Sequence, residues 1–189
     1  MKCDISKYFD SINHAILFSL IKRKIKDKRI IWLIQEIIKS SYKDEAGKGI
    51  PIGNLTSQLF ANIYLNKLDQ FVKRDLKKRN FIRYMDDFII LEREKKEMHL
   101  LKEKIKIFLR ENLRLEFNPK KADVSPLFLG IDFLGYILYK DYVLLRKSTV
   151  KRFLKKIKKD KTGGGGRINA WLAYARHANS FKLTKAVFK

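Results

Sequence analysis

The chain has 189 residues, which suits one domain of ordinary size or one domain with a small appendage. Hydrophobic residues make up 46% of the chain, enough to bury a core, so the composition excludes wholesale disorder. The apolar runs are strand-sized and the segment around Asp4 lacks a signal-peptide core, so the sequence predicts no membrane span and no secretion signal. The single cysteine, Cys3, excludes an internal disulfide framework and favours the reducing cytoplasm.

Charge is the strongest compositional signal. Lys and Arg number 43 against 20 Asp and Glu, which gives a formal net charge of +23. A field of this sign favours nucleic acid as the partner, because Lys and Arg release counterions when they neutralise phosphates. A lysine-rich solvated surface accounts for part of the excess, as in the segment 95–106. Because the basic residues are spread along the whole chain, a membrane surface is a poorer fit.

Helices and short strands follow one another along the chain. In order, we expect a strand over 1–6, helices over 10–26, 27–41 and 55–77, a hairpin over 81–91, a helix over 95–112, strands over 115–117, 122–124, 131–139 and 142–146, and helices over 148–159 and 167–189. Asp10 or Ser11 is the expected cap of the first helix. This order predicts an α+β fold, with the hairpin beside the first strand and helices packed on one face of an antiparallel sheet.

Four consecutive glycines occupy positions 163–166. Such a run predicts a flexible linker between the last two helices. A phosphate cradle is a poorer interpretation, because the Lys-Ser/Thr pair of a P-loop does not follow it.

Two adjacent acids, Asp86 and Asp87, interrupt the apolar run 81–91 at its expected turn. Taken alone they fit an exposed acidic turn about as well as a functional site, because Asp is common in turns. If the first strand pairs beside this hairpin, Asp4 lies close to Asp86. Converging carboxylates are the hard oxygen ligands that Mg²⁺ prefers. Two such ions roughly 3.5–4 Å apart can catalyse phosphoryl transfer.

Five segments, in order, resemble the motifs of bacterial reverse transcriptases. They are Lys2–Asp10, Gly49–Gln58, Arg83–Asp87 with its Tyr-Met-Asp-Asp box, Leu115–Lys121 and Phe133–Tyr136. Five motifs in order are far more specific than one. The resemblance implies a polymerase palm over residues 1–146 and a short, partial helical thumb over 147–189.

The resemblance also implies a metal centre. Asp4 and Asp86 would bind two Mg²⁺ ions, with Mn²⁺ as a substitute, and Asp87 would support them. The backbone of Ile5 would lie at the second ion. Lys121 matches a lysine near the pyrophosphate leaving group and is a candidate general acid.

Further matching positions would bind the incoming nucleotide. Phe9 would be a steric gate that excludes a ribonucleotide 2′-OH, although by itself a core aromatic is the simpler interpretation. Gly53 would allow the nucleotide and template a close approach that only glycine permits. Ser57 and Gln58 complete this motif. Many reverse transcriptases have Gln where this chain has Ile52, which cannot make the same hydrogen bonds.

The Ile52 version resembles the error-prone reverse transcriptases of diversity-generating retroelements. The segments 61–65, 68–69 and 171–180 continue that resemblance. A group II intron, retron or phage-defence reverse transcriptase is the alternative lineage. A non-catalytic nucleic-acid-binding palm module is the alternative from another functional class.

The function implied is that of an RNA-directed DNA polymerase in a bacterial or archaeal cytoplasm, with an RNA template, a DNA primer and deoxynucleoside triphosphates. The primer grip would comprise Phe133, Leu134, Gly135 and Tyr136. In the family a fingers subdomain precedes the motif that contains Asp4. We therefore expect a fragment without fingers, a subunit that needs another piece such as a fingers segment or a basic accessory protein, or a decayed copy, with little polymerase activity on its own.

Overall fold

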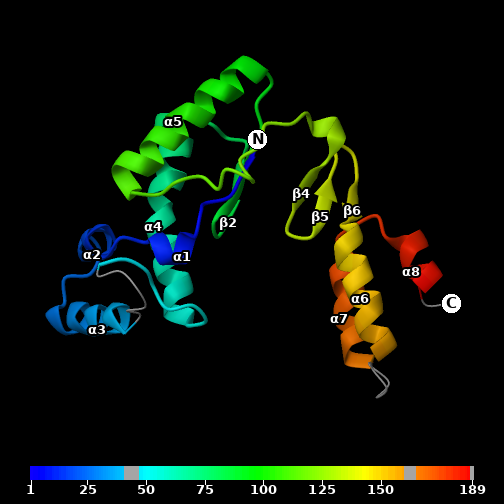
Figure 1. The fold of residues 1–189 in the computed structure, drawn as a ribbon, viewed down its shortest axis with the longest axis horizontal. Coiled ribbons are helices and arrows are strands. Elements are labelled where there is room, and N and C mark those ends of the chain that lie inside the picture. Colours follow the sequence, from blue (N-terminus) through cyan, green and yellow to red (C-terminus); the bar gives the residue numbers. More distant parts are fainter. Residues whose placement is uncertain (41–46, 160–164, 188–189) are drawn as a thin grey trace. The chain divides into compact units, whose positions relative to one another are not determined.

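The computed structural model describes residues 1–40, 47–159 and 165–187 (Figure 1). The chain divides into two compact units, Met1–Val124 and Ser125–Lys189. Each unit contains one small antiparallel sheet together with helices, so the α+β prediction is confirmed. Among the described residues, no helix combines the length and the apolarity needed to cross a bilayer.

The sheet of the first unit has three strands in the order β1-β3-β2. They are β1 (Lys2–Cys3), β2 (Phe81–Tyr84) and β3 (Asp87–Ile90). β2 and β3 form the predicted hairpin, and its last pair joins Tyr84 to Asp87. β1 runs antiparallel to β3 with Cys3 opposite Phe88. The prediction that the first strand lies beside the hairpin is therefore confirmed.

The helices of the first unit are α1 (Tyr8–Ser11), α2 (His14–Lys22), α3 (Lys28–Lys39), α4 (Leu55–Gln70), the π-helical turn η1 (Phe71–Asp75) and α5 (Lys95–Leu113). The single helix predicted over 10–26 is wrong, because Ile12 has an extended backbone with ψ 116° and separates α1 from α2. The predicted caps, Asp10 and Ser11, are wrong as well. Asn13 caps α2, and its side chain accepts a hydrogen bond from the Ile16 amide over 3.1 Å.

The core of the first unit lies on one face of this sheet. Phe88 of β3 is fully buried with Tyr64 and Leu68 of α4 and Ile105 of α5. β2 shows the same one-sidedness, since Phe81 is buried while its neighbour on the strand, Ile82, is exposed. Helices α4 and α5 thus cover the apolar face (Figure 1), as the sequence pattern predicts.

The segment 115–124 lies along the other edge of β1. The strands predicted over 115–117 and 122–124 are wrong as regular strands, since only isolated bridges form, Lys2 with Asp123 and Ile5 with Phe117. A turn closed by the Lys121 amide and the Asn118 carbonyl, 3.0 Å apart, interrupts the ladder. This interruption directs the side chains of the turn toward the end of β1.

The second unit contains β4 (Ile131–Phe133), β5 (Tyr136–Leu138), β6 (Val143–Leu145), the 3₁₀ turn η2 (Leu127–Leu129), α6 (Lys147–Lys159), α7 (Gly165–Ala175) and α8 (Phe181–Val187). Its core stacks Phe153 on Trp171 with ring centroids 4.2 Å apart. The single strand predicted over 131–139 is wrong, because the chain turns at Leu134 and Gly135 to form a hairpin. The single helix predicted over 167–189 is divided between α7 and α8.

The boundary between the two compact units lies after Val124 in the sequence, whereas the predicted palm–thumb division lies at residue 146. Leu145 and Tyr136 of the small sheet pack against the helices that contain Phe153 and Trp171, which places this sheet in the second unit. The functional division at 146 stays a prediction. In the predicted linker, residues 163 and 164 lie outside the described residues, whereas Gly165 begins α7.

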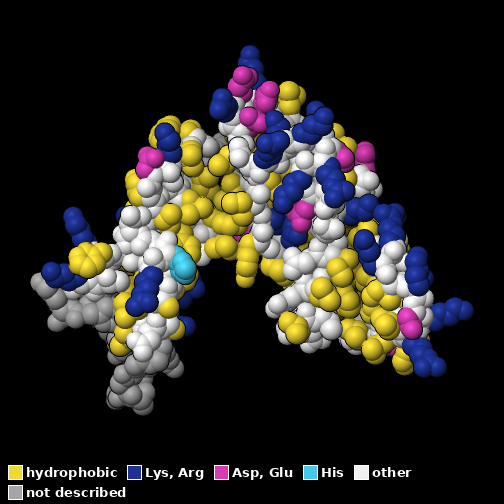
Figure 2. All heavy atoms as spheres, turned by 180° about the vertical axis from the view of Figure 1, so that it is seen from behind, with side chains coloured by type: hydrophobic (Ala, Val, Ile, Leu, Met, Phe, Trp, Pro, Cys, Tyr) yellow, Lys and Arg dark blue, Asp and Glu magenta, His cyan; other side chains and the backbone are white. Residues whose placement is uncertain are grey.

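The basic side chains are spread out on the face of the molecule drawn in Figure 2. Figure 2 shows Lys and Arg side chains distributed over the helices on the face in view, with acidic side chains between some of them. A positive charge spread in this way supports salt-sensitive attraction of nucleic acid without defining where it binds.

We expect the substitution Tyr64→Phe to lower the free energy of unfolding by about 1–3 kcal/mol. The Tyr64 hydroxyl is buried, donates to the Leu113 carbonyl over 2.7 Å and accepts from the Asn13 amide over 3.3 Å. The substitution leaves both backbone groups without this partner. Urea denaturation measures the loss, with Tyr142→Phe, at an exposed position, as the control. Equal stability of the two variants would contradict this account.

Candidate active site

The sheet brings Asp4 to the acidic turn. β1 ends at Cys3, and extending its register with β3 by one residue places Asp4 opposite Asp87. Asp86 is the second residue of the two-residue turn between β2 and β3. The first residue of the turn, Met85, has φ 54°, a left-handed conformation that costs a side chain roughly 1–2 kcal/mol. Asp4 therefore lies at the same end of the sheet as the adjacent Asp86 and Asp87, more than eighty residues away in the sequence, as predicted.

Asp4 is held on both of its carboxylate oxygens. Asp4 is only 6% exposed to solvent. The Asn118 amide group donates to Oδ1 over 3.1 Å, and Lys121 Nζ donates to Oδ2 over 2.7 Å. The Asn118 backbone amide also donates to the Asp4 carbonyl oxygen over 2.8 Å. The structure thus joins the predicted Lys121 to the site and adds Asn118, whose role the motif match alone did not indicate.

The electrostatics of the site favour an added cation. Burial raises the pKa of Asp86, and the negative charges of Asp4 and Asp87 raise it further. Burial likewise raises the pKa of Asp87, against the attraction of Lys2. The hydrogen bond to Asp4 raises the pKa of Lys121, so this ammonium stays charged at neutral pH. A second positive charge would relieve the repulsion that remains.

The donor set suits a hard divalent ion. Within residues 1–40, 47–159 and 165–187, no three acidic, His or Cys side chains are already arranged to hold a metal. Lys121 and Asn118 occupy the oxygens of Asp4 that such an ion would use. Asp87 Oδ1 is buried, and no hydrogen-bond partner for it lies in that part of the chain. Carboxylate oxygens are the ligands that Mg²⁺ prefers, so the chemistry of these side chains fits that ion.

Ile5 and Phe9 follow Asp4 in the chain. Ile5 is 1% exposed and its backbone bridges to Phe117, so its side chain belongs to the core and its backbone lies beside the acidic cluster. Phe9 is half-buried, packs against the core and meets the Tyr8 ring edge-on with centroids 5.7 Å apart. The steric-gate role of Phe9 stays a prediction.

The predicted nucleotide-binding motif divides into exposed and buried members. Ile52 is 69% exposed, and Gly53 beside it has φ 99°, a conformation that requires glycine. Gln58, at the start of α4, is exposed. Ser57 is fully buried, and its Oγ has no hydrogen-bond partner among the described residues. Ile52, Gly53 and Gln58 are therefore better placed than Ser57 to touch a nucleotide.

The predicted primer grip, Phe133–Tyr136, forms the turn of the β4-β5 hairpin in the second unit. Leu134 and Gly135 both have left-handed backbones, with φ 52° and 90°. Tyr174 of α7 donates its hydroxyl to the Leu134 carbonyl over 3.0 Å. A Cβ at Gly135 would lie 2.1 Å from that hydroxyl, so a side chain does not fit there. Sequence reasoning missed Tyr174 because its partner is distant in the chain.

Residues 1–138 match the family model described as "Reverse transcriptase (RNA-dependent DNA polymerase)". The chain belongs to the reverse transcriptase family. This match covers the acidic cluster, the nucleotide motif and the turn of the second unit. It agrees with the motif resemblance over most of its predicted extent.

Curated relatives point to intron-encoded proteins. The chain is 27% identical to Protein YkfC of Escherichia coli K12, over 71% of this chain and 45% of that protein. It is 28% identical to the group II intron-encoded protein LtrA of Lactococcus lactis subsp. cremoris, over 79% of this chain and 35% of that protein. The chain thus spans less than half the length of either relative.

A solved structure shares the fold. Apo telomerase from Candida tropicalis, truncated from its C-terminal domain, superimposes with a TM-score of 0.51 at 17% identity, over 73% of this chain and 33% of that chain. The family match and the similarity to LtrA support a bacterial reverse transcriptase of retroelement type. The predicted closeness to diversity-generating retroelements stays a prediction, and LtrA belongs to the lineage left as the alternative.

We expect Lys121→Gln to raise Mn²⁺ affinity about two- to fivefold, equivalent to about 0.4–1 kcal/mol. The substitution removes the ammonium that pairs with Asp4, at a side chain that is 56% exposed. Titration with free Mn²⁺ measured by electron paramagnetic resonance checks this. The control is Lys120→Gln, which loses the same charge one residue away and whose side chain is exposed. A weaker or unchanged affinity relative to Lys120→Gln would show that Lys121 does not compete for the site.

Proposed function

We propose that this chain is the palm of an RNA-directed DNA polymerase that adds deoxynucleotides to a DNA primer along an RNA template. One observation carries the proposal. The β1-β3-β2 sheet brings Asp4 together with Asp86 and Asp87 in a chain that matches the reverse transcriptase family over residues 1–138. The converging carboxylates supply the oxygen ligands that phosphoryl transfer by two metal ions requires.

The proposed mechanism assigns a task to each part of the site. Asp4, Asp86 and Asp87 would hold two Mg²⁺ ions, or Mn²⁺ as a substitute, together with the backbone of Ile5. Ions bound there would supply positive charge for the attack of a hydroxyl and the departure of pyrophosphate. Lys121, whose ammonium pairs with Asp4 in this structure, is assigned the donation of a proton to the pyrophosphate oxygen.

Nucleotide selection is assigned to the segment before α4 and to Phe9. Gly53 and the exposed Gln58 line the approach of the nucleotide, and the Phe9 ring excludes a 2′-OH. Ile52, exposed beside Gly53, supplies an apolar contact where an amide would supply hydrogen bonds. The partners proposed are the RNA template, the DNA primer, deoxynucleoside triphosphates and a basic accessory protein.

A non-catalytic nucleic-acid-binding palm is the second candidate function. The observation in its favour is that Lys121 and Asn118 already satisfy both oxygens of Asp4. A protein of this kind would bind RNA in a salt-sensitive way through its net charge of +23, without any dependence on metal.

We expect Asp86→Asn to weaken Mn²⁺ binding by roughly 100-fold or more, because removing a metal ligand costs more affinity than removing a group that only supports a ligand. Titration of the parent and the variant by electron paramagnetic resonance measures this, with Asp141→Asn, at an exposed position, as the control.

Binding requires ionised carboxylates, and the pKa values of Asp86 and Asp87 are raised. As the pH is lowered, the Mn²⁺ affinity should therefore begin to fall at a higher pH than it would if both side chains had the pKa of an ordinary aspartate.

Two outcomes would contradict this assignment. If Mn²⁺ affinity is the same in Asp86→Asn as in the parent, the acidic cluster is not the metal centre. If the parent binds RNA with a strong salt dependence and neither RNA nor nucleotide binding responds to Mn²⁺, the non-catalytic palm is the better description.

Error-prone copying is the finer proposal that rests on Ile52. In a polymerase that contains this palm and extends a primer, Ile52→Gln should lower misincorporation, because the amide restores hydrogen bonds that discriminate between nucleotides. Sequencing of the DNA copies measures the error rate. Ile30→Gln, exposed on α3, is the control. An unchanged error rate would remove the reason for assigning the chain to the mutagenic lineage.

A further inference from the structure

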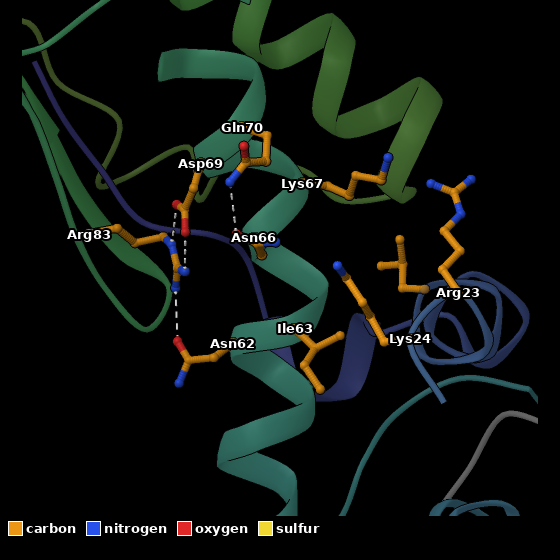
Figure 3. A pocket seen from close by; sticks show the side chains of 10 residues that line it. Arg23, Lys24, Asn62, Ile63, Asn66, Lys67, Asp69, Gln70 and Arg83 are labelled. Carbon is orange, nitrogen blue, oxygen red and sulfur yellow. Dashed lines mark hydrogen bonds and ion pairs between the residues drawn. The ribbon is translucent and has the colours of Figure 1, made fainter. Parts of the chain in front are cut away.

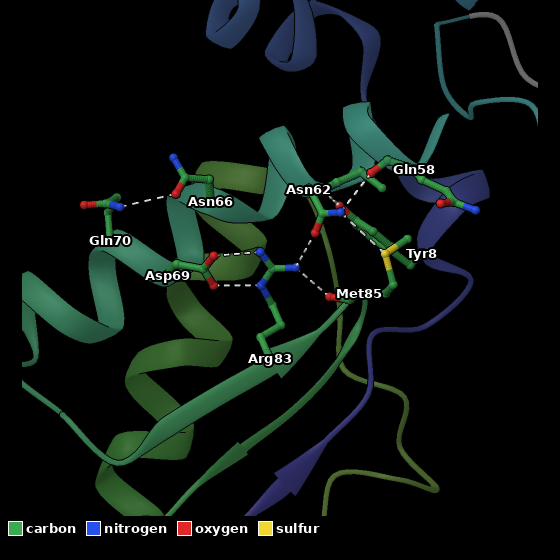
Figure 4. A network of polar contacts seen from close by, with 9 residues as sticks. Tyr8, Gln58, Asn62, Asn66, Asp69, Gln70, Arg83 and Met85 are labelled. Carbon is green, nitrogen blue, oxygen red and sulfur yellow. Dashed lines mark hydrogen bonds and ion pairs between the residues drawn. The ribbon is translucent and has the colours of Figure 1, made fainter. Parts of the chain in front are cut away.

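A polar network links helix α4 to the turn that contains the proposed metal ligands (Figure 4). Arg83 of β2 donates from Nε to Asp69 Oδ1 over 2.7 Å and from Nη2 to Asp69 Oδ2 over 2.6 Å. The two parallel bonds fix the plane of the guanidinium, which a single bond would leave free to rotate. The Arg83 side chain is only 9% exposed, so this orientation is maintained inside the protein.

The third guanidinium nitrogen of Arg83 contacts the turn itself. Nη1 donates to the Met85 carbonyl oxygen over 2.9 Å and to Asn62 Oδ1 over 3.2 Å. Asn62 in turn donates from Nδ2 to the Gln58 carbonyl oxygen over 3.1 Å and lies 3.6 Å from Met85 Sδ. Asn62 and Asp69 are about two helical turns apart, so one face of α4 presents both of them to Arg83.

The Met85 carbonyl is the acceptor that matters for the site. Met85 holds a left-handed backbone with φ 54°, which a residue other than glycine keeps only when its surroundings impose it. Its carbonyl group and the Asp86 amide belong to one planar peptide unit. A donor fixed on that carbonyl therefore fixes the plane from which Asp86 extends.

We propose that Asp69, Arg83 and Asn62 form a positioning network that anchors the Met85 carbonyl and so orients the Asp86 carboxylate toward the metal ions. The proposal rests on the function proposed above, because it assigns Asp86 to a metal. The three side chains act through the backbone of the turn. They are positioning residues and touch neither metal nor substrate.

A simple tether between α4 and β2 is the plainer interpretation of the ion pair. Asp69 and Arg83 line a cavity of about 560 Å³ between α2 and α4, together with Lys24 and Lys67 (Figure 3). The Asp69 side chain is 20% exposed. Water therefore reaches the carboxylate of the pair, which weakens the attraction that a tether would depend on. All three guanidinium nitrogens of Arg83 donate hydrogen bonds, and one of these bonds is to the turn. This arrangement fits a role in orienting the turn better than a role as a tether.

The decisive experiment measures Mn²⁺ affinity and stability separately in the full chain. Arg83→Lys keeps the positive charge but cannot bridge Asp69, Asn62 and the Met85 carbonyl at once. We expect Mn²⁺ affinity to fall about 10- to 100-fold, the usual effect of removing a partner that orients a ligand. Arg79→Lys, the same change at an exposed position just before β2, should bind as the parent does. Circular dichroism and thermal unfolding report the fold of each variant.

A charge exchange separates orientation from tethering. Combining Asp69→Arg with Arg83→Asp restores opposite charges between α4 and β2, yet it leaves position 83 without a donor for the Met85 carbonyl. We expect the midpoint temperature of thermal unfolding to be closer to the parental value in the double variant than in either single variant, while the Mn²⁺ affinity stays low. If affinity returns together with stability, the pair is a tether and the proposal is overturned.

Two further comparisons complete the test. If Arg83→Lys does not fold, Asn62→Ala removes an exposed partner of Arg83 and Met85, and parental Mn²⁺ affinity in that variant would overturn the network. Asp86→Asn is the reference variant. Parental affinity in Asp86→Asn would overturn the proposed metal centre and the network with it. Loss of binding in Asp86→Asn beside parental binding in Arg83→Lys would overturn the network alone.

Discussion

The antiparallel pairing of β1 with β3 places Asp4 beside the acidic turn, and the site exists only while this pairing holds. β1 has two residues, too few to be stable alone, and its stability comes from both edges. β3 pairs with one edge, and the segment that ends at Asp123 bridges to Lys2 on the other. Cys3 and Ile5 are buried on either side of Asp4, so burial of their apolar side chains holds the Asp4 carboxylate at this position. Lys121 offsets part of the charge of that carboxylate.

Two turns of this chain are stabilised in the same way. At Met85 and at Leu134 a residue with a side chain adopts a left-handed backbone, with φ 54° and 52°. In each turn the carbonyl of that residue accepts a hydrogen bond from a side chain of another element, Arg83 in one case and Tyr174 in the other. A strained turn needs such an anchor because its backbone would otherwise relax to a commoner conformation. Both turns lie in motifs shared with reverse transcriptases, so the anchors keep the motif backbones in fixed geometry.

The sequence predicted the larger elements well and their ends poorly. The apolar period of α4 and α5, the hairpin around Asp86 and the neighbouring first strand are all confirmed. Predictions failed where a local choice depended on distant contacts. Ile12 is extended because the following helix is capped by Asn13, whose backbone amide donates to the Tyr64 hydroxyl. The strands expected over 115–124 became bridges because the turn closed by Lys121 interrupts the ladder.

The sequence by itself determined the family, the α+β class and the identities of the acidic residues, because ordered motifs and apolar periodicity are local properties of the chain. Only the tertiary structure decided how those residues are supported. Asn118 and Lys121 reach Asp4 across more than a hundred residues, and Arg83 joins α4 to the turn before Asp86. Such contacts leave no periodic signal in a sequence, since they depend on which elements pack together. The burial that raises the pKa of Asp86 has the same origin, because it comes from the folded surroundings of the turn.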